Sequence, residues 1–406
     1  KNVGVSPLGS TSGLNWGGGV IQGGISLTGG SSINTPITLN GDPVIFSGSN
    51  SINLNAATAI TLTAARQLIN NLSGGALTIS GNISATAALT FNGPSNTTVS
   101  GQVTGAAGAV TMAGTGILAL TNLATATGAL TASRGTMSLE GAAGAWGSGT
   151  VTLNTNGTLK LDNSVTNNNN RLFDTGAITM QGGTLHLVGN GTTETAGAMT
   201  VNGIMGQILM TGSGSNTLSF GTVNFANSGS SLDLSSIGNL GTTNKVLFSA
   251  VQVAGSAWTN AILPRTLING DFARYDTTNG VVPFTTYNTS NNLNTAANTD
   301  TMEVTATVTM TANRTLNGLK ISGSGLSVGS PGVNLTLAAG ALLNTGGNNT
   351  YQGGTLAFSQ QGWIQVDPGT TLNLNAAVIN NTINKVGAGA LNINALTYHN
   401  TTTNLS

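Results

Sequence analysis

The densest group of ionisable side chains in this 406-residue chain is Asp271, Arg274, Tyr275 and Asp276. Two carboxylates accompanied by an arginine and a phenol are the residue types that acid–base cleavage of a glycosidic bond requires. Such a site needs both carboxylates on one face, whereas charges this close in sequence usually form a local network that closes a loop. We therefore expect no catalytic residue here, and a glycan-active enzyme is the weakest of three functions considered.

The two histidines are the next residues that could do chemistry. His399 follows Tyr398 but has no acid nearby, and we expect this pair to stack at a turn. His186 lies between Leu185 and Leu187, where alternation predicts an exposed strand residue. Neither histidine indicates catalysis, and the chain is predicted not to be an enzyme.

Metal and cofactor sites are not predicted either. Cysteine is absent, and the eight aspartates are scattered without the Gly-Gly-x-Gly-x-Asp frame of calcium-binding solenoids. The glycine-rich stretch "NWGGGVIQGG" does not lead into a helix bearing Lys and Ser or Thr, so it is not a phosphate loop. Glycines at tight corners are the simpler explanation.

The charge balance excludes further classes of partner. Only 5% of residues are charged, and 11 basic residues balance 11 acidic ones. A nucleic-acid-binding protein needs a basic stripe, and this chain has none. No apolar run approaches the ~20 residues of a spanning helix, so no membrane insertion is expected. The chain begins with Lys1, which suggests a processed protein or an excerpt of a longer one.

The elements that would position any site are short strands. An apolar–x–apolar unit bounded by Gly, Asn or Ser recurs along the chain, and period-2 alternation indicates a half-buried strand. Strands this short and this regular predict a repeat architecture, namely an all-β parallel β-solenoid with a narrow core. The units are Ile52–Leu54, Ile60–Leu62, Leu77–Ile79, Leu89–Phe91, Val110–Met112, Leu118–Leu120, Met137–Leu139, Val151–Leu153, Leu159–Leu161, Ile178–Met180, Leu185–Leu187, Leu218–Phe220, Leu232–Leu234, Leu319–Ile321, Leu335–Leu337, Ile364–Val366, Leu372–Leu374 and Leu391–Ile393.

The middle residue of each unit tests this interpretation. If the flanking residues point inward, the middle residue must face solvent. Four of these middle positions are charged or carry histidine, and we expect all four to be exposed: Lys160, His186, Asp233 and Lys320.

One segment interrupts the pattern. Residues 262–300 hold two prolines and the densest charges. We predict β-solenoid repeats over 1–261, an irregular insertion or junction over 262–300, and further solenoid repeats over 301–406.

The C-terminal residues "KVGAGALNINALTYHNTTTNLS" resemble the autotransporter-associated β-strand repeat of bacterial surface proteins. "GGNNTYQGGTLAFS" (Gly346 to Ser359) is similar, while Ala395, Leu396 and His399 depart from the pattern. The resemblance implies a right-handed parallel β-helix at the bacterial surface, but it does not imply a defined activity. The matching positions are Lys385, Gly387, Gly389, Leu391, Ile393, Tyr398 and Thr402.

From these observations we expect an extracellular or outer-membrane-attached structural or adhesive protein. Coils end in unpaired strand edges, so self-association, head to tail or lateral, would produce a fibre or filament. The alternative is a carbohydrate-binding or adhesin module that contacts surface glycans through aromatic platforms. Those platforms would be Trp16, Trp146, Trp258 and Trp363.

Overall fold

The computed structural model describes residues 13–55, 59–105, 108–380 and 383–395, together with the backbone of 398–399 and 404–405. Apart from the three-residue 3₁₀ turn η1 (Gly29–Ser31), every regular element in these residues is a β-strand. Within the described residues, no helix has the length and hydropathy that crossing a membrane requires. Parallel strands stack coil upon coil, so the predicted β-solenoid is confirmed.

The chain folds into two compact units. The first contains Lys1–Thr200, Gly206–Val223 and Ile237–Ser249, and the second contains Val201–Met205, Asn224–Ser236 and Ala250–Ser406. Each unit is described by itself below.

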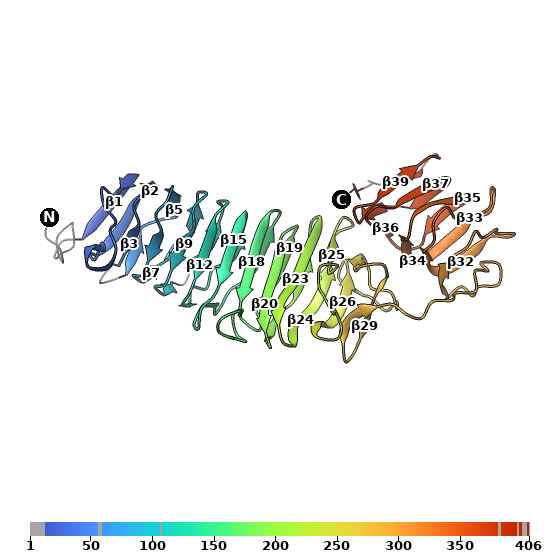
Figure 1. The fold of residues 1–406 in the computed structure, drawn as a ribbon, viewed down its shortest axis with the longest axis horizontal. Helices are drawn as coiled ribbons and strands as arrows, with labels where there is room; N and C mark the ends of the chain where they lie inside the picture. The colour runs from blue at the N-terminus through green and yellow to red at the C-terminus, as the bar shows by residue number, and fades with distance from the viewer. Residues whose placement is uncertain are drawn as a thin grey trace. The chain divides into compact units, whose positions relative to one another are not determined.

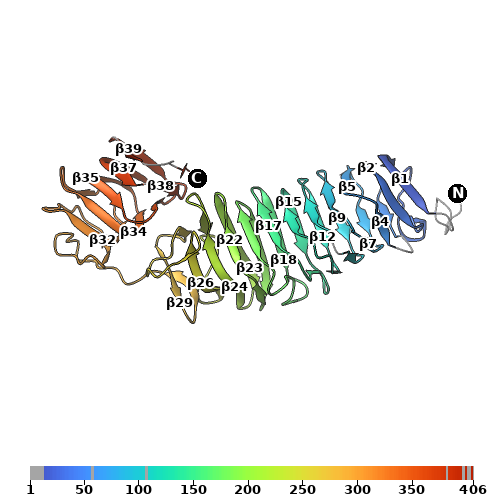
Figure 2. The same cartoon turned by 180° about the vertical axis from the view of Figure 1, so that it is seen from behind.

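Two sheets carry the coils of the first unit (Figures 1 and 2). Most of their strand pairs are parallel, whereas Asn244–Val253 and Ser256–Ala257 pair antiparallel. Three of their strands belong to the second unit: Ser231–Asp233, Ser256–Ala257 and Thr266–Leu267. The larger sheet consists of β1 (Leu14–Gln22), β2 (Ile37–Gly48), β4 (Ile60–Leu62), β5 (Arg66–Leu72), β7 (Ile83–Ser84), β8 (Leu89–Asn92), β10 (Val103–Thr104), β11 (Val110–Met112), β14 (Leu130–Ala132), β17 (Val151–Asn154), β19 (Ile178–Gln181), β21 (Thr193–Ala196), β22 (Met199–Val201), β24 (Asn216–Phe225), β26 (Asn244–Val253) and β27 (Ser256–Ala257). The smaller sheet consists of β3 (Ile52–Leu54), β6 (Leu77–Ile79), β9 (Thr97–Val99), β12 (Ile117–Leu120), β15 (Gly135–Leu139), β18 (Gly157–Asp162), β20 (Thr184–Asn190), β23 (Met205–Ser213), β25 (Ser231–Asp233) and β28 (Thr266–Leu267). A further pair is β13 (Leu123–Ala124) with β16 (Ala145–Trp146).

The core of the first unit is built from columns of stacked side chains. Parallel register places each inward residue on its counterpart in the next coil. Each apolar–x–apolar repeat of the sequence therefore extends a column by one layer. One column of the smaller sheet is buried throughout: Ile52, Leu77, Thr97, Leu118, Met137, Leu159, Leu185 and Ile208.

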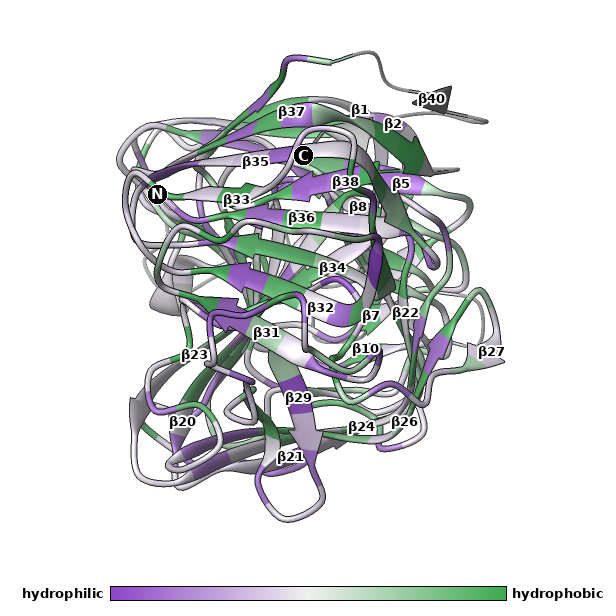
Figure 3. Cartoon of the chain, turned by 90° about the vertical axis from the view of Figure 1, so that its right-hand side faces the viewer, coloured by the Kyte–Doolittle hydropathy of each residue, from purple (hydrophilic) through white to green (hydrophobic). Residues whose placement is uncertain are grey.

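The second unit contains an 11-stranded sheet. Hydrophobic and hydrophilic residues succeed one another along β37, as Figure 3 shows. Residues 262–300 hold β28 and an antiparallel hairpin of β29 (Ala273–Asp276) and β30 (Gly280–Pro283). The sheet is formed by β31 (Thr301–Val304), β32 (Arg314–Ile321), β33 (Ser327–Gly329), β34 (Leu335–Asn344), β35 (Asn348–Phe358), β36 (Gly362–Val366), β37 (Thr371–Asn380), β38 (Ile383–Val386), β39 (Ala390–Ile393), β40 (Tyr398–His399) and β41 (Asn404–Leu405).

Part of this sheet is covered on both faces. Leu342 and Ile364 belong to the interior cluster of the solenoid. Their neighbours Leu343 and Trp363, which alternation directs to the opposite face, pack in a second cluster with Phe272 of the 262–300 segment. The outer face of β34 and β36 is therefore a second core.

Coverage of the outer face explains why one of the four middle residues predicted to be exposed, Lys320, is buried. Lys160 and His186 lie on the outer face of their strands, as predicted, but both are half-buried rather than fully exposed. Lys320 and Asp233 are only 7% and 6% exposed, so the prediction of exposure was wrong for both. Lys320 is covered by residues of the 262–300 segment, which alternation within a strand cannot reveal.

The final repeat keeps the predicted alternation where it is described. Leu391 and Ile393 pack against the interior cluster, and Asn392 is exposed. Nδ2 of Asn392 donates to Oδ1 of Asn373 on the coil below, at 2.8 Å. The backbone of Tyr398 and His399 forms β40, which pairs with β37, but their side chains and Thr402 lie outside the described residues.

Candidate functional site

The acids of the 262–300 segment have separate partners. Oδ1 of Asp276 accepts hydrogen bonds from the backbone amides of Thr278 and Asn279, both at 2.9 Å, and thereby closes the hairpin turn. Nη1 of Arg274 lies 3.7 Å from Oδ2 of Asp276. Asp271 instead pairs with Lys320. The group therefore does not present two free carboxylates to a substrate.

A group of charged residues in the second unit surrounds Lys320. We call it the Lys320 cluster, and it consists of Lys320, Asp271, Glu303 and the phenol of Tyr287. Nζ of Lys320 lies 2.5 Å from Oδ1 of Asp271 and 3.1 Å from Oε1 of Glu303. It also lies 4.9 Å from the centre of the Tyr287 ring, an attractive cation–π arrangement. Burial raises the pKa of the Tyr287 phenol, which therefore stays protonated. With its ammonium held by two carboxylates, Lys320 acts as a structural cation.

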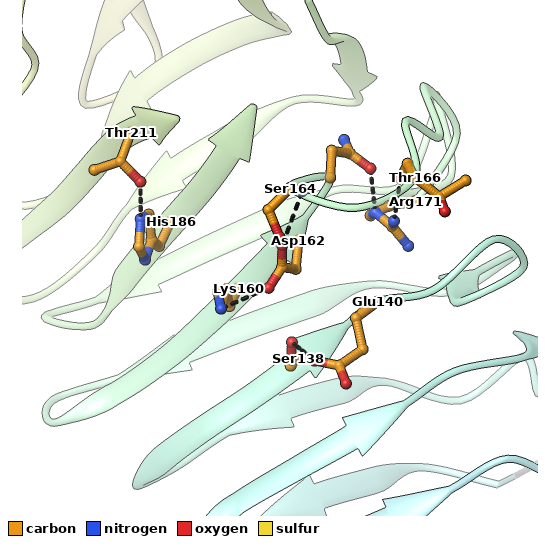
Figure 4. Close-up of polar contacts among 10 residues, drawn as sticks. Ser138, Glu140, Lys160, Asp162, Ser164, Thr166, Arg171, His186 and Thr211 are labelled. Atoms are coloured by element: carbon orange, nitrogen blue, oxygen red, sulfur yellow. Dashed lines mark hydrogen bonds and ion pairs between the residues drawn. The ribbon is translucent and has the colours of Figure 1, made fainter. Parts of the chain in front are cut away.

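The outer face of the first unit carries a strip of polar residues on consecutive coils. Ser138, Lys160 and His186 are in register on β15, β18 and β20. Each has a polar partner, as Figure 4 shows: Glu140 for Ser138, Asp162 for Lys160 and Thr211 for His186. Nζ of Lys160 lies 2.6 Å from Oδ2 of Asp162, and Nε2 of His186 lies 2.8 Å from Oγ1 of Thr211. Burial alone would raise the pKa of Asp162, but hydrogen bonds from Lys160 and Ser164 lower it to about 2.

The His186 ring on this strip is neutral near pH 7. Burial lowers its pKa, and the charge of Lys160 lowers it further. Because its Nε2 is already engaged with Thr211, the ring has no free base for proton abstraction on that side. The strip is therefore a set of polar residues whose hydrogen-bonding groups are largely satisfied within the chain.

A buried pair that the sequence pattern did not reveal lies at one edge of the first unit. Arg171 and Glu194 are both 0% exposed. The Glu194 carboxylate accepts hydrogen bonds from the backbone amides of Arg171 at 3.1 Å and Leu172 at 2.9 Å. The Arg171 guanidinium donates to Asn163 Oδ1 and to the carbonyl of Gly144, both at 2.6 Å. It also donates to the carbonyl of Thr166 at 3.2 Å (Figure 4). These contacts fasten the loop after β18 onto the coils.

A cleft of about 320 Å³ in the second unit is lined by two carboxylates, Asp233 and Asp367. Nε2 of the fully buried Gln365 donates to Asp367 Oδ1 at 2.7 Å and to the carbonyl of Ile268 at 3.1 Å. Asp233 accepts from the amide of Ser235 at 2.8 Å. Sequence reasoning missed this pair because the two acids lie on coils far apart in the chain.

Two of the four proposed tryptophan platforms are wrong. Trp146 and Trp363 are 1% and 2% exposed, so neither ring offers a face to a sugar. Trp258 and Trp16 are half-buried. Nε1 of Trp258 donates to the carbonyl of Ile262 at 2.8 Å, and the Trp16 ring packs edge-on against Phe46. Trp16 and Trp363 thus pack against aromatic rings of other parts of the chain.

The first strand of the first unit is a sheet edge. Among the described strands, β1 pairs only with β2. It contains neither a charged residue nor a proline, and Val20 on it is 64% exposed. A groove of about 350 Å³ beside it is lined by Leu14, Trp16, Val20, Ile21, Gln22, Leu27 and Ile33. Natural edge strands usually carry charges or proline that prevent pairing, and β1 carries neither.

The described residues contain no group of three or more His, Cys, Asp or Glu side chains placed to hold a metal ion. Comparison of the chain with family models, with curated proteins and with solved structures finds no match. The function therefore has to be argued from the geometry of the chain itself.

Proposed function

We propose that this protein is a structural component of an extracellular or cell-surface assembly, in which β-solenoid coils self-associate end to end. The observation that carries the proposal is β1, an uncharged edge strand beside an apolar groove. A second copy could continue the ladder by adding a strand to this edge, which is a head-to-tail contact that propagates into a filament. The resemblance of the last repeat to surface-protein repeats supports the same location.

The test compares assembly of the unmodified chain with that of an edge variant. Light scattering after size exclusion and negative-stain microscopy should show oligomers or filaments that increase with protein concentration. Val20→Lys places a charge on the edge and should reduce assembly. Val165→Lys is the matched control, because Val165 is 90% exposed and lies outside every strand. An unmodified chain that stays monomeric at high concentration contradicts the proposal.

Glycan binding is the second candidate function. Burial of Trp146 and Trp363 removes half of its proposed aromatic platforms. A polar groove in the second unit favours a form of glycan binding that uses no aromatic platform and is independent of self-association.

A further inference from the structure

A polar groove lies at the first coil of the 11-stranded sheet. Its volume is about 440 Å³. Every residue that lines it carries an amide, a hydroxyl or a guanidinium: Asn298, Asn313, Arg314, Thr315, Asn334, Thr336 and Thr355. None of these side chains is apolar or aromatic.

The cation of this groove is Arg314, the first residue of β32. It is in register with Leu335, which pairs in turn with Leu356, so it occupies a column that is apolar in the next two coils. Its Nε is buried without a hydrogen-bond partner, and none of the ion pairs in the described part of the chain includes it. A half-buried cation without a counter-ion is costly, and an anion bound beside it would remove that cost.

The groove lies where the sheet has an open edge. β31 pairs with β32 from Gly318 to Ile321 only, which leaves Thr315 without a strand on that side. The amide of Arg314 donates towards β34, and the amide of Asn317 donates to Asp300 on the opposite side. Because main-chain groups alternate in direction along a strand, Thr315 directs its N–H and C=O towards the open side.

Two asparagines make the groove rich in donors. Oδ1 of Asn313 accepts from the amide of Asn334, and Oδ1 of Asn334 accepts from the amide of Thr355, both at 2.9 Å. With the carbonyl oxygens turned to the backbone, each side chain has its NH₂ group left for a ligand. The guanidinium of Arg314 and the NH₂ groups of Asn313 and Asn334 together suit a ligand that carries an anionic group with further hydrogen-bond acceptors beside it.

We propose that this groove binds a carboxylate-bearing saccharide, with the carboxylate on the Arg314 guanidinium and the hydroxyls on Asn313, Asn334 and the neighbouring threonines. Arginine holds a carboxylate through two parallel hydrogen bonds. A peptide with a free C-terminal carboxylate fits less well. Strand addition needs a longer open edge than residues 314–316 offer, and it needs pockets for alternate side chains, which a wholly polar lining does not provide.

Calorimetry on the full chain tests this assignment, with trigalacturonate as probe and maltotriose as its neutral counterpart. We expect binding of trigalacturonate, no heat with maltotriose, and a loss of at least about tenfold in affinity for Arg314→Gln. Arg134→Gln is the matched control, since Arg134 is an exposed arginine of the first unit, and it should bind as the unmodified chain does. Thr336→Glu keeps Arg314 in place and should abolish binding by repulsion, so the test survives if Arg314→Gln does not fold.

Several results would overturn the proposal. These are no binding of trigalacturonate at about 10 mM, equal binding of maltotriose, or unchanged affinity in both groove variants. Acetate that competes as well as the trisaccharide would show an adventitious ion only. Tighter binding of a peptide with a free C-terminal carboxylate would reassign the groove. None of these outcomes depends on whether the chain self-associates.

Discussion

The ammonium nitrogen of Lys320 lies 2.5 Å from Oδ1 of Asp271, and the two residues come from opposite sides of a buried interface within the second unit. Lys320 is on the outer face of β32, while Asp271 precedes the hairpin of β29 and β30. The pair therefore fastens the 262–300 segment to the solenoid sheet. Asp271, considered from the sequence as a candidate acid, serves as an anchor.

Removal of Lys320 should destabilise this unit. We expect Lys320→Ala to lower the free energy of unfolding by about 3 kcal/mol, because Asp271 and Glu303 would be left without their common cation. Lys160→Ala removes a more exposed pair, that with Asp162, and should cost less than about 1 kcal/mol. Chemical denaturation of both variants gives the comparison, and equal losses would show that the Lys320 cluster is not an anchor.

Glu194 should make the first unit less stable as the pH rises. Burial raises the pKa of its carboxyl from 4.5 to about 7, against the lowering effect of two backbone amides and Arg171. The folded state therefore favours the protonated acid, and this contribution is complete below pH 4.5 and lost as the pH rises through about 7. The loss is at most about 3 kcal/mol.

The Glu194→Gln variant isolates this effect. The neutral amide resembles the protonated acid, so the difference in unfolding free energy between the two proteins should change with pH between 4.5 and 7. Denaturation curves at several pH values measure it. A difference that stays constant across this range would mean that Glu194 does not titrate there.

Because the coils stack closely, replacing Gly212 by alanine should strongly destabilise the first unit. Gly212 has φ +99°, and an added Cβ would lie 2.1 Å from the carbonyl oxygen of Gly189 on the preceding coil. Gly191 has φ +69° with nothing within 4 Å of such an atom. We expect Gly191→Ala to cost about 1 kcal/mol, from the backbone conformation alone. Gly212→Ala should cost at least twice as much by thermal melting, and similar losses would contradict the close approach.

Trp363 should behave as a core residue. Its ring centroid lies 5.7 Å from that of Phe272, and only 2% of its surface is exposed. Trp363→Ala should destabilise the second unit by about 3 to 5 kcal/mol through the cavity it leaves. Trp16→Ala, at a half-buried position, should cost clearly less. Loss of sugar binding in Trp363→Ala without loss of stability would restore the platform interpretation.

Much of the fold could be predicted because each coil repeats one local rule. Residues such as Leu159 and Leu161 alternate with a polar neighbour, and all of the predicted inward positions up to Leu374 are buried. Short-range alternation was sufficient there because a narrow solenoid core is filled by the strand itself. Candidate sites were less predictable. Arg314 and Asn334 come together through the stacking of coils, whereas Asp233, on a strand of one sheet, and Asp367, directly after a strand of another, line one cleft.

By itself, the sequence determined which residues alternate and that the chain is all-β. The tertiary structure decided which outer faces remain at the surface. Lys160 and Lys320 hold the same middle position in the same local pattern, yet one stays half-exposed and the other is buried beneath the 262–300 segment. The physical reason is that alternation fixes the side of the strand on which a residue lies, whereas burial of that side depends on what another part of the chain places over it.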